Sequence, residues 1–130
     1  MILLDTHVVL WLALEQAKIS KKAKAAIEEA RNSGEGLGIS GITLLEIATL
    51  EKKRRIALQS TLETFLTEVE KRFVVLPITA RVCVRAMGLA ASFPSDPADR
   101  LITATALVEG IPLLTADDEI RRSKAVTTLW

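Results

Sequence analysis

Apolar residues along the chain gather in five short runs, and longer segments of mixed polarity separate these runs. Short apolar runs without polar alternation are typical of strands that are buried on both faces of a sheet. The pattern therefore predicts strands at 1–5, 37–40, 73–78, 111–117 and 125–130.

The segments between these runs carry helical spacing and helix-terminal residues. In the segment 20–36, Ser20 suits the N-cap, Ala23, Ala26, Ile27 and Ala30 recur on one face, and Gly34 or Gly36 suits the end. Similar spacing and cap signals predict helices at 6–15, 20–36, 41–55, 58–72, 79–93 and 96–110, with a helical turn at 118–123. Strands that alternate with helices pair in parallel beneath helices on both faces. We expect one three-layer α/β/α domain over residues 1–130, with a parallel sheet of about five short strands.

Four acidic residues stand in apolar surroundings, whereas most of the sixteen acids do not. Asp5 and Asp117 end the first and fourth predicted strands. Glu46 interrupts "ITLLEIATL", and Asp99 opens "LITATALV". The carboxyl ends of parallel strands and the first turns of the helices that follow them share one edge of a sheet. We therefore expect these four carboxylates to converge at that edge.

Helix capping accounts for these acids one at a time. Asp96 before Pro97 suits an N-cap, and Thr43 with Glu46 fits a capping box. Four clustered carboxylates without a cation would repel one another and raise their own pKa values. One or two hard divalent cations, Mg²⁺ or Mn²⁺, would relieve this repulsion, because they prefer oxygen ligands. The cluster as a whole therefore indicates a metal site.

Composition and charge narrow the function classes. With 130 residues, 49% of them hydrophobic, the chain is long and apolar enough to fold. The net charge of +1 does not indicate a nucleic-acid partner, so any RNA surface must be local. Two basic runs are available, each of which also fits an ordinary solvated helix end: Lys52, Lys53, Arg54 and Arg55 in "EKKRR", and Arg121 and Arg122 in "RRSK".

A single cysteine, Cys83, excludes an internal disulfide, and with His7 as the single histidine a structural zinc site is not expected. No apolar stretch reaches the roughly 20 residues that span a bilayer, and the N-terminus lacks a basic signal-peptide region. We expect a cytoplasmic protein with no membrane contact. Trp11 fits the core or a dimer contact, and Cys83 fits a buried position in an apolar helix.

The acidic segments also resemble a known family. "MILLDTHVVLW", "SGITLLEIA", "SDPADRLITATA" and "LLTADDEI" resemble, in order, the four acidic motifs of PIN-domain ribonucleases, and most closely those of VapC-type toxins. The resemblance covers essentially the whole chain. It implies a PIN-like fold and assigns the catalytic and metal-binding roles to Asp5, Glu46, Asp99 and Asp117. Supporting roles are implied for Thr6, Thr115 and Asp96.

The resemblance implies a metal-dependent endoribonuclease that leaves 5′-phosphate and 3′-hydroxyl ends and acts as a toxin inhibiting translation and growth. It implies three partners, namely an RNA substrate, a cognate antitoxin and a second copy of the chain. Thr115 is expected to hold Asp117 or a water molecule. Ala98 departs from the pattern, since this branch usually has a bulky aromatic residue there, and the local packing is therefore expected to differ.

Two other classes place acids at strand ends. A phosphatase of the haloacid-dehalogenase class needs a second Asp two residues after the first, where this chain has His7. A phospho-receiver or binding module needs an Asp after "FVVLPI", where the run itself ends in Pro77 and Ile78. Neither class uses Glu46 and Asp99, so the ribonuclease interpretation is favoured.

Overall fold

Five parallel strands form the centre of the computed structural model, which describes all residues from 1 to 130. The strands are β1 (Ile2–Leu4), β2 (Leu37–Ser40), β3 (Val74–Leu76), β4 (Leu113–Leu114) and β5 (Thr128–Leu129). Their order across the sheet is β3-β2-β1-β4-β5. In the central strand, Leu3 pairs with Gly38 on one side and with Leu113 on the other. The predicted parallel sheet of five short strands is confirmed.

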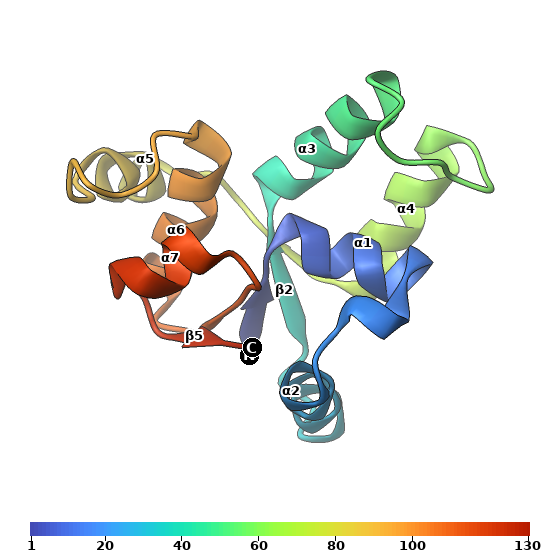
Figure 1. Ribbon diagram of the computed structural model, residues 1–130, viewed down its shortest axis with the longest axis horizontal. Helices are drawn as coiled ribbons and strands as arrows, with labels where there is room; N and C mark the ends of the chain where they lie inside the picture. Colours follow the sequence, from blue (N-terminus) through green and yellow to red (C-terminus); the bar gives the residue numbers. More distant parts are fainter.

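Helices cover both faces of the sheet. They are α1 (Thr6–Leu14), the 3₁₀ turn η1 (Gln16–Lys18), α2 (Lys21–Asn32), α3 (Gly41–Lys52), α4 (Leu62–Arg72), α5 (Ala80–Met87), α6 (Pro97–Glu109) and α7 (Asp118–Ser123). Helices α1, α2 and α4 lie on one side of the strands, and α5, α6 and α7 lie on the other (Figure 1). The three-layer α/β/α prediction is confirmed. None of these helices has the length and apolar character that crossing a bilayer requires.

Neighbouring strand residues supply the two larger of the three hydrophobic cores. Leu4 packs in the cluster that contains Val8 and Ile27, on the side of α1 and α2. Leu3 packs in the cluster that contains Ile102, on the side of α6. This division follows because successive side chains of a strand point to opposite faces. The continuous apolar run at the start of the chain therefore supplies both cores at once.

Three expectations about local structure are wrong. Helix α5 ends at Met87, whereas the pattern predicted a helix to residue 93. Strand β3 lies at the edge of the sheet, with Val74 46% exposed, and is not buried on both faces. Cys83 is exposed, because the buried face of α5 carries Val82 and Ala86.

Candidate active site at the carboxyl edge of the sheet

Acidic residues cap three of the helices that start at the carboxyl edge of the sheet. Asp5 caps α1, where its Oδ1 accepts a hydrogen bond from the N–H of Thr6 at 2.8 Å. Asp96 caps α6 through the N–H of Ala98 at 3.3 Å, and Asp117 caps α7 through Ile120. Thr6 is the first residue of α1 and does not cap it. All three acids therefore act as helix N-caps, and these caps lie at the carboxyl edge of the sheet.

Capping does not account for Glu46. Ser40 is the N-cap of α3, with its hydroxyl accepting from the N–H of Ile42, so Thr43 and Glu46 form no capping box. Glu46 is the sixth residue of α3, one turn further into the helix than the third position that a capping box requires. The position of Glu46 therefore calls for another explanation.

A single cavity of about 370 Å³ joins all of the acids that the sequence singled out. Its lining residues are Asp5, His7, Trp11, Glu46, Asp96, Asp99, Ala116 and Asp117. Asp5, Asp96 and Asp117 are helix N-caps, and the other two lining acids lie within helices, Glu46 in α3 and Asp99 in the first turn of α6. The predicted convergence of the four carboxylates is thus observed in the structure.

Thr115 holds the first acid in place. Its hydroxyl donates to Oδ2 of Asp5 at 2.7 Å, and the hydroxyl oxygen of Thr115 also accepts the N–H of Asp117 at 3.0 Å. Both Asp5 and Thr115 are buried. The sequence-based expectation was that Thr115 holds Asp117 or a water; in the structure it holds the side chain of Asp5 and only the backbone of Asp117.

Two threonines orient Glu46. The hydroxyl of Thr6 donates to Oε1 of Glu46, and the hydroxyls of Thr6 and Thr43 lie 3.0 Å apart. A hydroxyl has one proton to donate. Since Thr6 uses its proton on Glu46, Thr43 donates to Thr6. Thr43 is a supporting residue that sequence reasoning treated only as part of a capping box; its position one helical turn before Glu46 was the available signal.

Three acids of the cavity hold protons more tightly than usual. Burial raises the pKa of Asp5, although the hydrogen bonds from Thr115 and Thr6 oppose this effect. Burial also raises the pKa of Glu46. Asp99 has the clearest change, because burial and then the charges of Asp96, Asp5, Asp117 and Glu46 raise its pKa to about 7. The cavity concentrates negative charge that the chain itself does not neutralise.

Asp99→Asn is expected to stabilise the protein in chelator at alkaline pH. A carboxyl whose folded pKa lies above its unfolded value lowers stability as pH rises, here from about 4 to about 7. The variant should gain about 1 kcal/mol in free energy of unfolding at pH 8, a figure reduced for the partial exposure of the group. The gain should shrink toward zero near pH 4. Urea denaturation in EDTA at several pH values measures it, and a gain independent of pH would contradict the electrostatic origin.

The donor set fits a hard divalent cation that keeps part of its water shell. Every acidic ligand candidate offers carboxylate oxygen, which is the donor that Mg²⁺ and Mn²⁺ prefer. No group of three or more His, Cys, Asp or Glu side chains is placed to hold an ion directly. Mg²⁺ commonly binds through one or two carboxylates and several waters, which suits this spacing.

The basic residues do not join this cavity. Lys52 ends α3, and Arg54 and Arg55 line a separate hollow beside Leu58. Arg121 lies on α7, near the carboxylate of Asp118 at 3.7 Å. The structure therefore does not bring the predicted RNA-binding residues, Lys52, Lys53, Arg54, Arg55, Arg121 and Arg122, to the acidic cavity.

Ala98 leaves the start of α6 regular. It is buried and donates its N–H to Asp96, so the departure from an aromatic residue does not remove the cap. Arg100, two residues further on, does not neutralise the acids. Its guanidinium donates to the backbone carbonyls of Ala86, Ala90, Phe93 and Pro94 instead.

A parallel α/β/α domain with acids from two strand ends, one helix cap and two helices around one cavity defines a PIN-type domain. The chain belongs to the PIN domain family, whose family model matches residues 2–125. It is 37% identical to Ribonuclease VapC22 of Mycobacterium tuberculosis over 131 aligned positions, which cover 99% of this chain and 98% of that protein.

Solved structures support the fold at lower identity. VapBC2 of Rickettsia felis, bound to a DNA fragment from its promoter, contains a chain that is 16% identical with a TM-score of 0.72; the match covers 98% of this chain and 97% of that one. A toxin–antitoxin complex from Klebsiella pneumoniae contains a chain that is 22% identical with a TM-score of 0.67, again covering 98% and 97%. At these identities the likeness concerns the fold.

Proposed function

We propose that this protein is a metal-dependent endoribonuclease and the toxin of a toxin–antitoxin pair. The observation that carries this proposal is the convergence of Asp5, Glu46, Asp99 and Asp117 on one cavity. The relative with 37% identity over almost its whole length is named a ribonuclease, which supports the same activity here. A substrate of cellular RNA implies a cytoplasmic location.

Asp5, Asp99 and Asp117 are the proposed ligands of Mg²⁺ or Mn²⁺, one or two ions, directly or through water. The metal, when bound, activates water and shields the charge of the phosphodiester. The chain's own contribution is orientation. Thr115 fixes the orientation of the Asp5 side chain, because its hydroxyl donates a hydrogen bond to Oδ2.

Glu46 is the proposed group that orients the attacking water. The donation from Thr6 occupies Oε1 of Glu46, and Oε2 has no hydrogen-bond partner within the protein. The free oxygen can therefore accept a hydrogen from water in the cavity. Thr43 holds the position of Thr6, so the threonine pair sets the direction of the Glu46 carboxylate.

Cleavage of total cellular RNA by the purified protein tests the proposed function. The wild type should yield discrete products with 5′-phosphate ends in Mg²⁺ or Mn²⁺ and none in EDTA. Asp99→Asn should yield none in any of these buffers. Absence of cleavage together with absence of Mn²⁺ binding in calorimetry would mean that the carboxylates serve only the fold.

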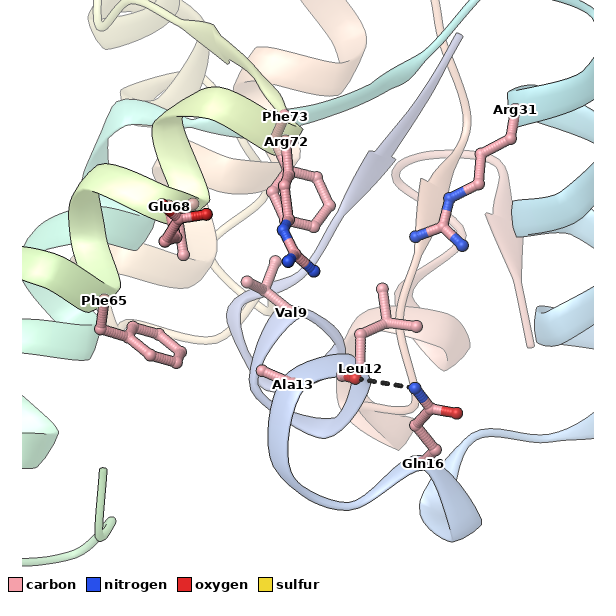
Figure 2. Close-up of a pocket in the computed structure, with 10 residues that line it drawn as sticks. Val9, Leu12, Ala13, Gln16, Arg31, Phe65, Glu68, Arg72 and Phe73 are labelled. Carbon is pink, nitrogen blue, oxygen red and sulfur yellow. Dashed lines mark hydrogen bonds between the residues drawn. The ribbon is translucent and has the colours of Figure 1, made fainter. Parts of the chain in front are cut away.

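A cleft of about 510 Å³ between α1, α2 and α4 suits the proposed antitoxin (Figure 2). Its floor is apolar, with Val9 and Leu12 from α1 and Phe65 from α4. Arg31 and Arg72 reach toward it from opposite walls, and neither forms an ion pair within the chain, whereas Glu68, the one acid of the lining, is paired with Lys71 at 3.6 Å. An apolar surface with two free guanidinium groups fits an antitoxin segment in which acidic residues flank apolar ones.

Charge reversal in this cleft is expected to release the antitoxin without changing the nuclease. Arg31→Glu together with Arg72→Glu should weaken binding of the antitoxin encoded beside this gene at least about tenfold, because each reversed charge repels an acidic segment. RNA cleavage by the free toxin should be unchanged. Calorimetric titration measures the affinity, with Lys22→Glu, an exposed residue of α2 that does not line the cleft, as the control. An unchanged affinity in the double variant would place the antitoxin elsewhere.

We propose that a second copy of the chain packs against the outer face of α5 and forms a homodimer. Val84 and Met87, three residues apart on one helical face, are 73% and 71% exposed. Large apolar side chains grouped in this way mark interaction surfaces more often than singly exposed ones do. Sedimentation velocity should show a dimer for the wild type and a monomer for Val84→Glu.

A further inference from the structure

Aromatic rings form one wall of the acidic cavity. Trp11 and His7 both line it beside the carboxylates. Their ring centroids lie 6.0 Å apart with planes tilted by 51°. Trp130, the last residue, lies behind Trp11 at 5.6 Å and does not line the cavity. The three rings form an aromatic row in which Trp11 lies close to both of the others, and His7 and Trp11 line the cavity.

Core packing explains only part of this row. Trp11 packs partly against the core cluster beneath α1, but it is not fully buried, and His7 is exposed. The chain has two tryptophans and three phenylalanines, and both tryptophans lie in this row. The side of the row that faces the acids is therefore available to a ligand.

We propose that His7 and Trp11 bind a nucleobase of the RNA strand beside the phosphodiester that is cleaved. This inference rests on the proposed ribonuclease function and names residues that hold its substrate. The acidic cavity repels phosphate groups, and the basic runs of the chain lie outside it. Stacking on a ring does not depend on net charge and tolerates every base, so it provides affinity where electrostatic attraction is missing.

Lys18 extends the same surface. Its ammonium group lies 5.9 Å from the centroid of the Trp11 ring and forms a 3.0 Å ion pair with Glu15. Both partners of that pair are exposed, and such pairs contribute little and exchange readily. Lys18 is therefore free to contact the phosphate that follows a base held by Trp11.

Binding of two matched strands in Ca²⁺ tests this inference without cleavage. One strand is a fluorescent oligouridylate of about twelve nucleotides, and the other is an abasic strand with the same number of phosphates. The wild type should bind the oligouridylate about tenfold more tightly, as one stacked base provides. Trp11→Leu should lose this preference and keep its affinity for the abasic strand.

His7→Ala and Trp130→Leu complete the design. His7 is exposed, so its removal does not disturb the core, and it should weaken the preference for bases. Trp130→Leu removes a ring that packs on Trp11 from outside the cavity, and it should keep the preference. A preference retained in Trp11→Leu, or absent from the wild type, would overturn the inference. Failure of the ribonuclease proposal is recognised separately, by the absence of metal-dependent cleavage of cellular RNA by the wild type.

Discussion

Asp5→Asn is expected to reduce RNA cleavage on the order of 10³-fold or more while the protein keeps its fold. Asp5 is the most buried acid of the cavity, at 7% exposure, and lies where the central strand meets α1. The amide oxygen of asparagine is neutral, so it binds a divalent cation far more weakly than the carboxylate does. Mn²⁺ binding should weaken in parallel with the loss of cleavage.

The fold is expected to survive this change for two reasons. Asparagine is as good an N-cap as aspartate, so the N–H of Thr6 keeps its acceptor. Burial raises the pKa of the Asp5 carboxyl, so its charged form is unfavourable in the folded protein. The neutral amide removes this desolvation cost at neutral pH. The melting temperature in EDTA should therefore equal or exceed that of the wild type.

Asp118→Asn is the matched control. Asp118 follows Asp117 in the chain, its side chain is 77% exposed, and it does not line the cavity. Its variant should cleave RNA at the wild-type rate. Parallel assays with Mn²⁺, together with circular dichroism, separate loss of chemistry from loss of fold. Cleavage by Asp5→Asn at the wild-type rate with unchanged metal dependence would contradict the assignment of Asp5.

The acidic cavity was predictable because local rules determine most of it. A parallel sheet brings its strand ends to one edge, so residues that end apolar runs meet there whatever the strand order is. Asp5 and Asp117 were found in this way, and Asp99 followed from its place in a helix that Asp96 caps. Four isolated acids at such positions were enough to indicate the site.

The contacts that orient these acids were not predictable from the same rules. Thr43 meets Thr6 across 37 residues, and Thr115 meets Asp5 across 110, through side-chain hydrogen bonds that depend on how α3 and β4 pack beside β1. Hydrophobic periodicity carries no signal for such pairs. The exposed edge position of β3 has the same origin, since strand order is a tertiary property.

The end of α5 shows a third limit. Apolar spacing favoured a helix to residue 93, but the chain leaves the helix at Gly88 and continues irregularly to Asp96. Several carbonyls of this segment find their donors on Arg100, which lies in the next helix. Hydrogen bonds from a side chain of the next helix thus replace the backbone hydrogen bonds of the longer helix that the local pattern predicted.

Arg100→Met is therefore expected to lower the free energy of unfolding by about 3 kcal/mol. The guanidinium donates to the carbonyls of Ala86 at 3.2 Å, Ala90 at 3.3 Å, Phe93 at 3.1 Å and Pro94 at 3.0 Å, and it lies 5.6 Å from the centroid of the Phe93 ring. Methionine keeps the apolar stem but leaves the carbonyls of Phe93 and Pro94 without a donor, whereas those of Ala86 and Ala90 keep a backbone N–H. Some of these carbonyls can accept hydrogen bonds from water instead, which limits the loss in free energy of unfolding.

Two further variants separate the geometry of Arg100 from its charge. Arg100→Lys keeps the charge, but one ammonium group cannot reach four carbonyls in different directions, so it should recover less than half of the lost stability. Arg85→Met removes an exposed arginine of α5 that makes no hydrogen bond and should be neutral. Urea denaturation of the three variants gives the comparison. Equal stability of Arg100→Met and Arg85→Met would mean that the segment before Asp96 holds its shape without Arg100, and that the start of α6 is positioned by its cap alone.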